Sequence, residues 1–94
     1  MLKVNSYEGH SLVNATASLQ HPMADEISLA FGDGAMARFP YSVEIAFFKN
    51  SEWVSKILPE FAAYSDGEDA GTRVYAFVPL TLVSQFIDNW SKKN

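Results

Sequence analysis

The side chains that could perform acid, base or metal chemistry are few and widely spaced in this chain of 94 residues. There is no cysteine, which removes disulfides, thiolate catalysis and zinc sites built on sulfur. The two histidines, His10 and His21, could join carboxylates such as Asp25, Glu26 or Asp33 around zinc, iron or manganese. Their spacing does not require this, because one follows a turn glycine and the other precedes a proline, where histidines are commonly exposed. We therefore predict no metal site and no cofactor.

An acidic segment, Asp66 to Gly71, resembles part of a calcium-binding loop. It has carboxylates at its first and third positions and glycine at its sixth, as an EF-hand loop does. Its fifth position is Ala70, however, and its twelfth is Phe77, where such a loop carries a bidentate glutamate. We expect residues 65–71 to form a solvated surface loop instead.

Two glycines, Gly32 and Gly34, flank Asp33 and could suggest a phosphate-binding loop. Such a loop is longer and leads into a helix, whereas here a strand-like pattern follows at once. We predict a tight hairpin turn, with the returning strand beginning near Ala35 and interrupted by Pro40. The chain has no nucleophile elbow of the form G-x-S-x-G, and we do not expect it to be an enzyme.

The charge balance is mildly acidic, since seven basic residues against eleven acidic ones give a formal net charge of −4. Nucleic-acid binders usually carry clustered lysine and arginine, and the local concentration here is limited to Lys92 and Lys93. No stretch approaches the roughly 20 apolar residues of a membrane span, and residues 1–8 lack the uninterrupted apolar run of a signal peptide. We therefore predict a soluble, cytoplasmic protein that binds neither nucleic acid nor membranes.

Length and apolar content predict a single globular domain over residues 1–94. In much of the chain apolar residues recur at every second position, which is the period of a β-strand. The segments expected as strands on this basis are 2–6, 11–19, 27–31, 41–48 and 72–78. In the last of these, Val74, Ala76 and Val78 would share one face and Arg73, Tyr75 and Phe77 the other. Because both faces are largely apolar, this strand should lie near the centre of the sheet.

Residues 51–64 allow two interpretations. Trp53, Ile57 and Phe61 belong to a set of apolar residues at helical spacing, which favours a helix kinked at Pro59. Alternation from Trp53 to Ile57 would equally suit a strand that follows a turn over residues 49–52. We favour a kinked or two-piece helix.

The end of the chain predicts a helix packed on the sheet. Pro79 suits a first helical turn, and the apolar residues after it recur at spacings of three and four. This stripe consists of Leu80, Val83, Phe86, Ile87 and Trp90. The expected fold is thus α+β, with a mostly antiparallel sheet of about five strands, a C-terminal helix and a shorter helical segment packed on it.

The surplus of aromatic residues is the one compositional feature that suggests function, with seven Phe, four Tyr and two Trp. Aromatic residues and arginine are enriched at the centres of protein interfaces. We therefore expect a non-enzymatic protein-interaction module that forms a homodimer or binds another protein, as a prokaryotic or phage accessory protein of the inhibitor or immunity type would. The candidate interface residues are Arg73, Tyr75, Phe77, Phe48 and Tyr41.

The alternative is a small-molecule-binding protein, or a very small enzyme, with a pocket between the helix and the sheet. Its candidate lining residues are Trp53, Phe61 and Trp90, with Tyr75 and Phe77 nearby. An enclosed aromatic cavity would favour this alternative, and a flat exposed patch would favour the interaction module.

Overall fold

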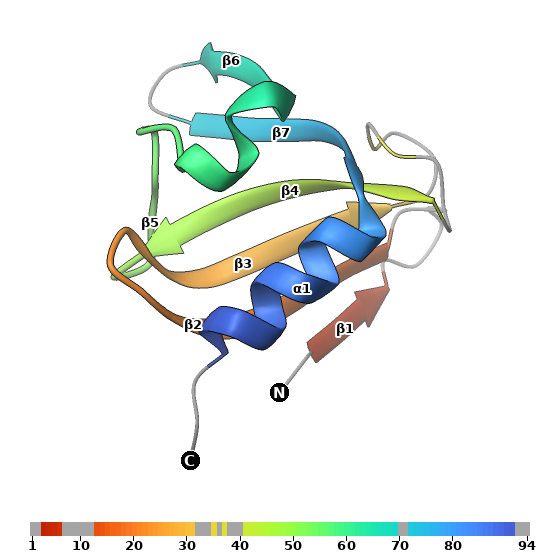
Figure 1. The fold of residues 1–94 in the computed structure, drawn as a ribbon, viewed down its shortest axis with the longest axis horizontal. Helices are drawn as coiled ribbons and strands as arrows, with labels where there is room; N and C mark the ends of the chain where they lie inside the picture. Colours follow the sequence, from red (N-terminus) through yellow and green to blue (C-terminus); the bar gives the residue numbers. More distant parts are fainter. Residues whose placement is uncertain are drawn as a thin grey trace.

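The computed structural model describes residues 3–6, 13–31, 35, 37, 41–69 and 72–91, with residues 3–6, 13 and 67–69 described by their backbone alone. An antiparallel sheet has the strand order β1-β2-β3-β4-β7-β6, with β5 paired to the end of β4 (Figure 1). The predicted α+β class is confirmed. The elements are β1 (Lys3–Ser6), β2 (Val13–His21), β3 (Ala24–Phe31), β4 (Ser42–Lys49), β5 (Glu52–Trp53), the 3-10 helix η1 (Pro59–Tyr64), β6 (Ser65–Asp69), β7 (Thr72–Pro79) and α1 (Leu80–Trp90).

Strand β2 has the predicted alternation. Ala15, Ala17 and Leu19 are buried on the side of α1, and the polar residues between them face the other side. Across the β2–β3 pair, Ala15 lies opposite Leu29 and Ala17 opposite Ile27, so that the same face of β3 is apolar. The strand continues two residues beyond the predicted segment and ends at His21, before Pro22.

Strand β4 is also alternating, with Val43, Ile45 and Phe47 buried. It begins at Ser42, however, so the prediction of a returning strand near Ala35 is wrong. The described residues Ala35 and Ala37 belong to no strand, and the register places Ala30 opposite Glu44. The turn predicted at residues 32–34 and the strand interruption predicted at Pro40 lie outside the described residues.

The favoured helix over residues 51–64 is wrong for residues 51–58, which are not helical, whereas residues 59–64 form a short 3-10 helix. Asn50 and Ser51 have φ values of 52° and 66°, and positive φ at both central residues is the geometry of a two-residue type I′ hairpin turn. The turn pairs β5 with β4, so the alternative was right about the turn, although its strand ends at Trp53. A helical segment begins only at Pro59, whose missing N–H suits a first turn.

Residues 65–69 form strand β6, where we expected a surface loop. Their backbone pairs with β7, and polar side chains are compatible with this because β6 lies at the edge of the described sheet. Residues 70 and 71 of the predicted loop lie outside the described residues.

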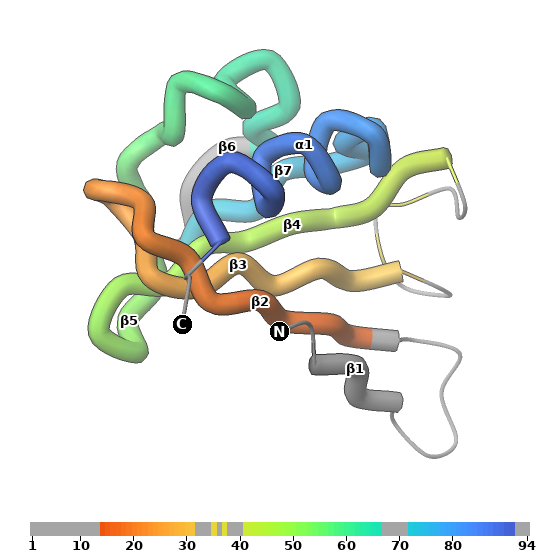
Figure 2. Tube along the Cα trace, turned by 60° about the horizontal axis from the view of Figure 1, so that its bottom comes forward, coloured from red at the N-terminus to blue at the C-terminus, as the bar shows by residue number. Residues whose placement is uncertain are grey.

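Helix α1 packs on one face of the sheet together with η1, as Figure 2 shows. Val83 and Phe86 of the predicted stripe are buried. Rings from four elements form an aromatic core, with centroids 4.9 to 6.1 Å apart. These rings belong to Phe47, Phe61, Tyr75 and Phe86. Neither described helix has the length and apolar character of a membrane span.

Candidate functional site

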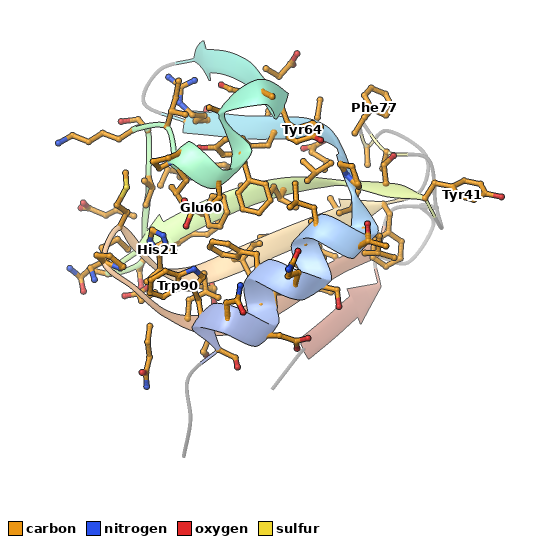
Figure 3. The ribbon with its side chains drawn as sticks, viewed as in Figure 1. His21, Tyr41, Glu60, Tyr64, Phe77 and Trp90 are labelled. Carbon is orange, nitrogen blue, oxygen red and sulfur yellow. The ribbon has the colours of Figure 1, made fainter. Side chains whose placement is uncertain are left out.

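The five predicted interface residues do not share one surface. Tyr75 is fully buried, which corrects the expectation that it lies on an accessible sheet face. Tyr41 and Phe77 are 80% and 50% exposed (Figure 3). Phe48 is half-buried on the opposite side of the sheet from α1.

A bulge in β7 explains why Tyr75 is buried. Tyr75 lies opposite Ile45 but Val78 lies opposite Val43, so β7 has one residue more than β4 over this stretch. Tyr75 and Val78 can therefore both point into the core, although they are three residues apart. The extra residue shifts Phe77 outward, with a positive φ of 51°. The predicted alternation of β7 is wrong from this point onward.

The fifth interface candidate, Arg73, makes contacts within the chain. Its Nε donates to the carbonyl oxygen of Ser55, and its Nη1 donates to Oγ of Ser65 at 2.6 Å. The guanidinium therefore joins β7 to the segment before η1 and to the start of β6. Two donor groups of Arg73 are therefore used in hydrogen bonds within the fold.

The three predicted pocket residues do not line a common cavity. Phe61 and Trp90 border a groove of about 90 Å³ between η1 and α1, which is small beside ordinary ligand sites of roughly 300–1,000 Å³. Trp53 is not part of that groove, because its pairing with Phe48 holds it in β5. The expected pocket between helix and sheet is thus not formed by these residues.

His21 is buried, with 7% of its surface exposed, which corrects the expectation of an exposed histidine. Its Nδ1 accepts a hydrogen bond from the N–H of Met23 at 3.0 Å. This assigns the ring proton to Nε2, which donates to the Glu60 carboxylate at 2.9 Å. The ring also packs edge-on against Trp90, with centroids 4.6 Å apart, and Figure 3 shows the three residues together.

With both ring nitrogens engaged, His21 has no free nitrogen for proton transfer or metal binding in this arrangement. Its bonds instead connect the β2–β3 hairpin to η1. No group of three or more histidine, cysteine, aspartate or glutamate side chains that could hold a metal occurs among the described residues.

The side of the sheet opposite α1 carries a row of cross-strand neighbours. Ser18 pairs with Glu26, Glu26 with Phe48, and Phe48 with Trp53, so these four side chains share one face across four strands. No described helix covers this face (Figure 2). We call it the open face, formed by Asn14, Thr16, Ser18, Glu26, Ser28, Ala46, Phe48 and Trp53.

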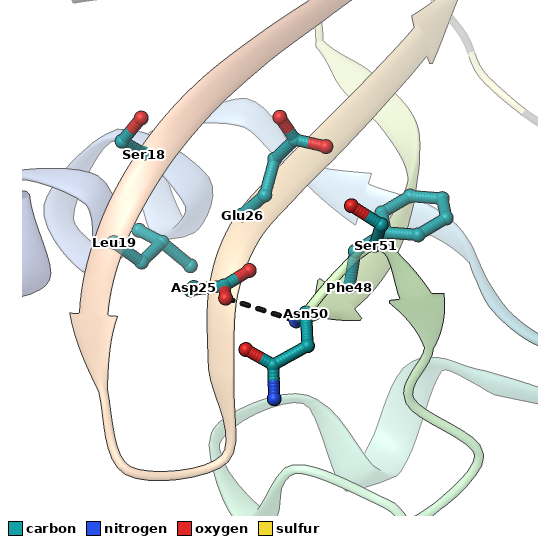
Figure 4. Close-up of a pocket in the computed structure, with 7 residues that line it drawn as sticks. All are labelled: Ser18, Leu19, Asp25, Glu26, Phe48, Asn50 and Ser51. Atoms are coloured by element: carbon teal, nitrogen blue, oxygen red, sulfur yellow. Dashed lines mark hydrogen bonds between the residues drawn. The ribbon is translucent and has the colours of Figure 1, made fainter.

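A hollow of about 310 Å³ lies at one end of the open face, between the β2–β3 and β4–β5 hairpins (Figure 4). The N–H of Asn50 donates to Oδ2 of Asp25 at 3.0 Å and so joins the two hairpin ends. The lining is rich in hydrogen-bond acceptors, and no lysine or arginine belongs to it. The lining residues are Ser18, Leu19, Asp25, Glu26, Phe48, Asn50 and Ser51.

An aromatic pair adjoins the hollow. The rings of Phe48 and Trp53 are 4.8 Å apart at an angle of 52°, and Trp53 is 43% exposed. Sequence reasoning had assigned Phe48 to an interface and Trp53 to a pocket, and the structure places them side by side. The sequence analysis does not identify Asn50 and Ser51 as site residues. The alternative turn over residues 49–52 would have placed Phe48 opposite Trp53.

A second hollow, of about 330 Å³, lies between α1 and β3. It is mostly apolar, with Leu29, Leu80, Val83 and Ile87 among its lining residues and Asp88 at its border. Asp88 is its one ionisable lining residue, so this hollow has fewer polar groups with which to recognise a ligand than the hollow on the open face.

No protein-family model, curated protein or solved structure matches this chain. The open face combines an aromatic pair with a hollow that two carboxylates line.

Proposed function

We propose that this protein is a non-enzymatic interaction module that binds a protein partner through the open face. The observation that carries the proposal is the contact of half-buried Phe48 with exposed Trp53 beside the hollow. Tryptophan is enriched among the residues that contribute most to binding energy, and a sheet face that no described helix covers and that carries an aromatic pair suits contact with a protein surface. The partner would be a second copy of the chain or another protein, as in an inhibitor or immunity protein.

The described residues also favour binding over catalysis. The buried histidine uses both nitrogens for internal hydrogen bonds, and the hollow contains carboxylates, hydroxyls and an amide without a histidine or lysine to act beside them. The cytoplasmic location and the prokaryotic or phage origin stay predictions from the sequence.

The small-ligand alternative keeps one supporting observation. At about 310 Å³, the hollow on the open face is at the lower end of the size range for ligand sites. It replaces the predicted pocket between helix and sheet as the place where a small molecule would bind.

Site-specific photo-crosslinking tests the proposal. A benzoylphenylalanine introduced at position 53 should give one discrete adduct in cells, with a second copy or with another protein, whereas the same group at the exposed position 85 on α1 should not. The purified adduct partner should then bind the unmodified chain and lose that binding with Trp53→Ala. Identical adducts from both positions, or partner binding that does not depend on Trp53, would contradict a role for the open face.

A further inference from the structure

We infer that the open face receives a basic segment of a different protein, with an arginine side chain seated in the hollow, and that it is not a self-association surface. The inference rests on the proposed function and specifies the chemistry of the partner. It begins from the charge of the hollow, which both Asp25 and Glu26 line.

These carboxylates have little internal compensation. Asp25 accepts one backbone hydrogen bond at Oδ2, and the described side chains bring no cation to the lining. The hydrogen bond between His21 and Glu60 joins the β2–β3 hairpin to η1 and takes no part in the hollow. The hollow therefore presents an excess of acceptors and negative charge, which a donor-rich cation would complement.

A second copy would not supply that cation. In a two-fold dimer the same patch meets itself, so that residues near the axis face their own equivalents. A dimer centred on Phe48 and Trp53 would bring the adjoining Asp25 and Glu26 of both copies together. The formal charge of −4 on each chain adds to this repulsion.

Arginine fits the combination of groups better than lysine does. Its guanidinium has a planar fork of donors that matches a carboxylate, and its flat face stacks on aromatic rings. Glu26 and Phe48 are cross-strand neighbours, and Trp53 follows Phe48 in the same row. A single guanidinium entering the hollow would thus meet a carboxylate and lie beside the Phe48 ring, which packs against the exposed indole of Trp53.

Selection from a random-peptide phage library on the purified protein tests the inference. Enriched peptides are measured by calorimetry against the unmodified chain, Trp53→Ala, Glu26→Gln and Asp88→Asn. Asp88→Asn is the matched control, because it removes one negative charge from exposed α1, away from the open face. We expect arginine-containing peptides whose affinity falls about tenfold with Glu26→Gln, as loss of one charge-assisted hydrogen bond implies, and is unchanged with Asp88→Asn.

The outcomes separate the two proposals. Peptides that require Trp53 but contain no arginine, or that bind Glu26→Gln as tightly as the unmodified chain, would overturn the inference and leave the interaction module standing. Equal losses with Glu26→Gln and Asp88→Asn would indicate attraction to net charge alone and would also overturn it. A dimer in sedimentation equilibrium that dissociates with Trp53→Ala would overturn it in favour of self-association. If no enriched peptide requires Trp53, the proposed function itself fails.

Discussion

The phenolic oxygen of Tyr75 accepts a hydrogen bond from the backbone N–H of Leu58 at 3.0 Å, within the core. Both residues are fully buried, and Leu58 immediately precedes η1. One side chain of β7 therefore fixes the position at which the chain turns into η1. This contact explains why a tyrosine that alternation places on a surface is retained in the interior.

Tyr75→Phe should lower the free energy of unfolding by about 1–3 kcal/mol, because the buried N–H of Leu58 loses its acceptor. Urea denaturation followed by tryptophan fluorescence measures the change. Tyr41→Phe is the matched control, since Tyr41 is 80% exposed and its hydroxyl removal should leave stability unchanged. Equal effects of the two substitutions would show that the core hydrogen bond contributes nothing.

Stability should also decrease at alkaline pH. Burial raises the pKa of Tyr75 above its ordinary value of 10.0, and the charge of Glu60 raises it further. The Leu58 hydrogen bond and the charge of Arg73 lower this pKa but do not cancel the effect of burial. The folded chain thus holds the phenolic proton more tightly than the unfolded chain. This contribution to stability is complete below pH 10 and is lost as the pH rises through the folded-state pKa. Above pH 10 the denaturation midpoint of Tyr75→Phe should fall less steeply with pH than that of the unmodified chain. Parallel curves for the two proteins would show that the Tyr75 phenol does not cause the loss of stability.

The His21 cluster should depend more on its packing than on its charge. His21→Ala leaves a cavity beside Phe86 and Trp90 and an unpaired N–H at Met23, and should cost about 2–3 kcal/mol. Glu60→Gln keeps an oxygen that accepts from Nε2, so its cost should stay below about 1 kcal/mol. Thermal and urea unfolding of both variants measure this difference. A Glu60→Gln loss as large as that of His21→Ala would show that the charge of Glu60 dominates.

The bulge in β7 predicts an unusual order of stability at position 77. Because Phe77 has a positive φ, Phe77→Gly should be more stable than Phe77→Ala by about 1 kcal/mol, although both lack the ring. Ser84 on α1 provides the opposite case, where Ser84→Ala should be more stable than Ser84→Gly by about 1 kcal/mol. The same order at both positions would exclude the left-handed conformation of Phe77.

The elements that sequence reasoning predicted well are those with an unbroken local period. The apolar residues of β2 alternate without interruption, the core residues Val43, Ile45 and Phe47 of β4 occupy every second position, and the apolar residues of α1 recur at helical spacing, so each element buries an apolar face. The predictions failed where backbone pairing breaks the period. The extra residue in β7 places Tyr75 in the core, and the turn at Asn50 and Ser51 replaces an expected helix.

The open face could be predicted only in part. Its polar side on β2 follows from alternation, but the meeting of Phe48 and Trp53 requires the register of β4 with β5. The hollow likewise depends on two hairpin ends joined by the bond from Asn50 to Asp25. These residues are 25 positions apart, and local patterns contain no information about such a contact.

The sequence by itself determined the α+β class, the strands and helix with regular apolar periods, the acidic charge and the absence of thiol chemistry. Those properties depend on residue types and on spacing within one element. Tertiary structure alone decided that His21 and Tyr75 are buried, that Phe77 points outward, and that a carboxylate-lined hollow adjoins an aromatic pair. The physical reason is that strand register, bulges and hydrogen bonds between hairpins depend on pairing of distant segments.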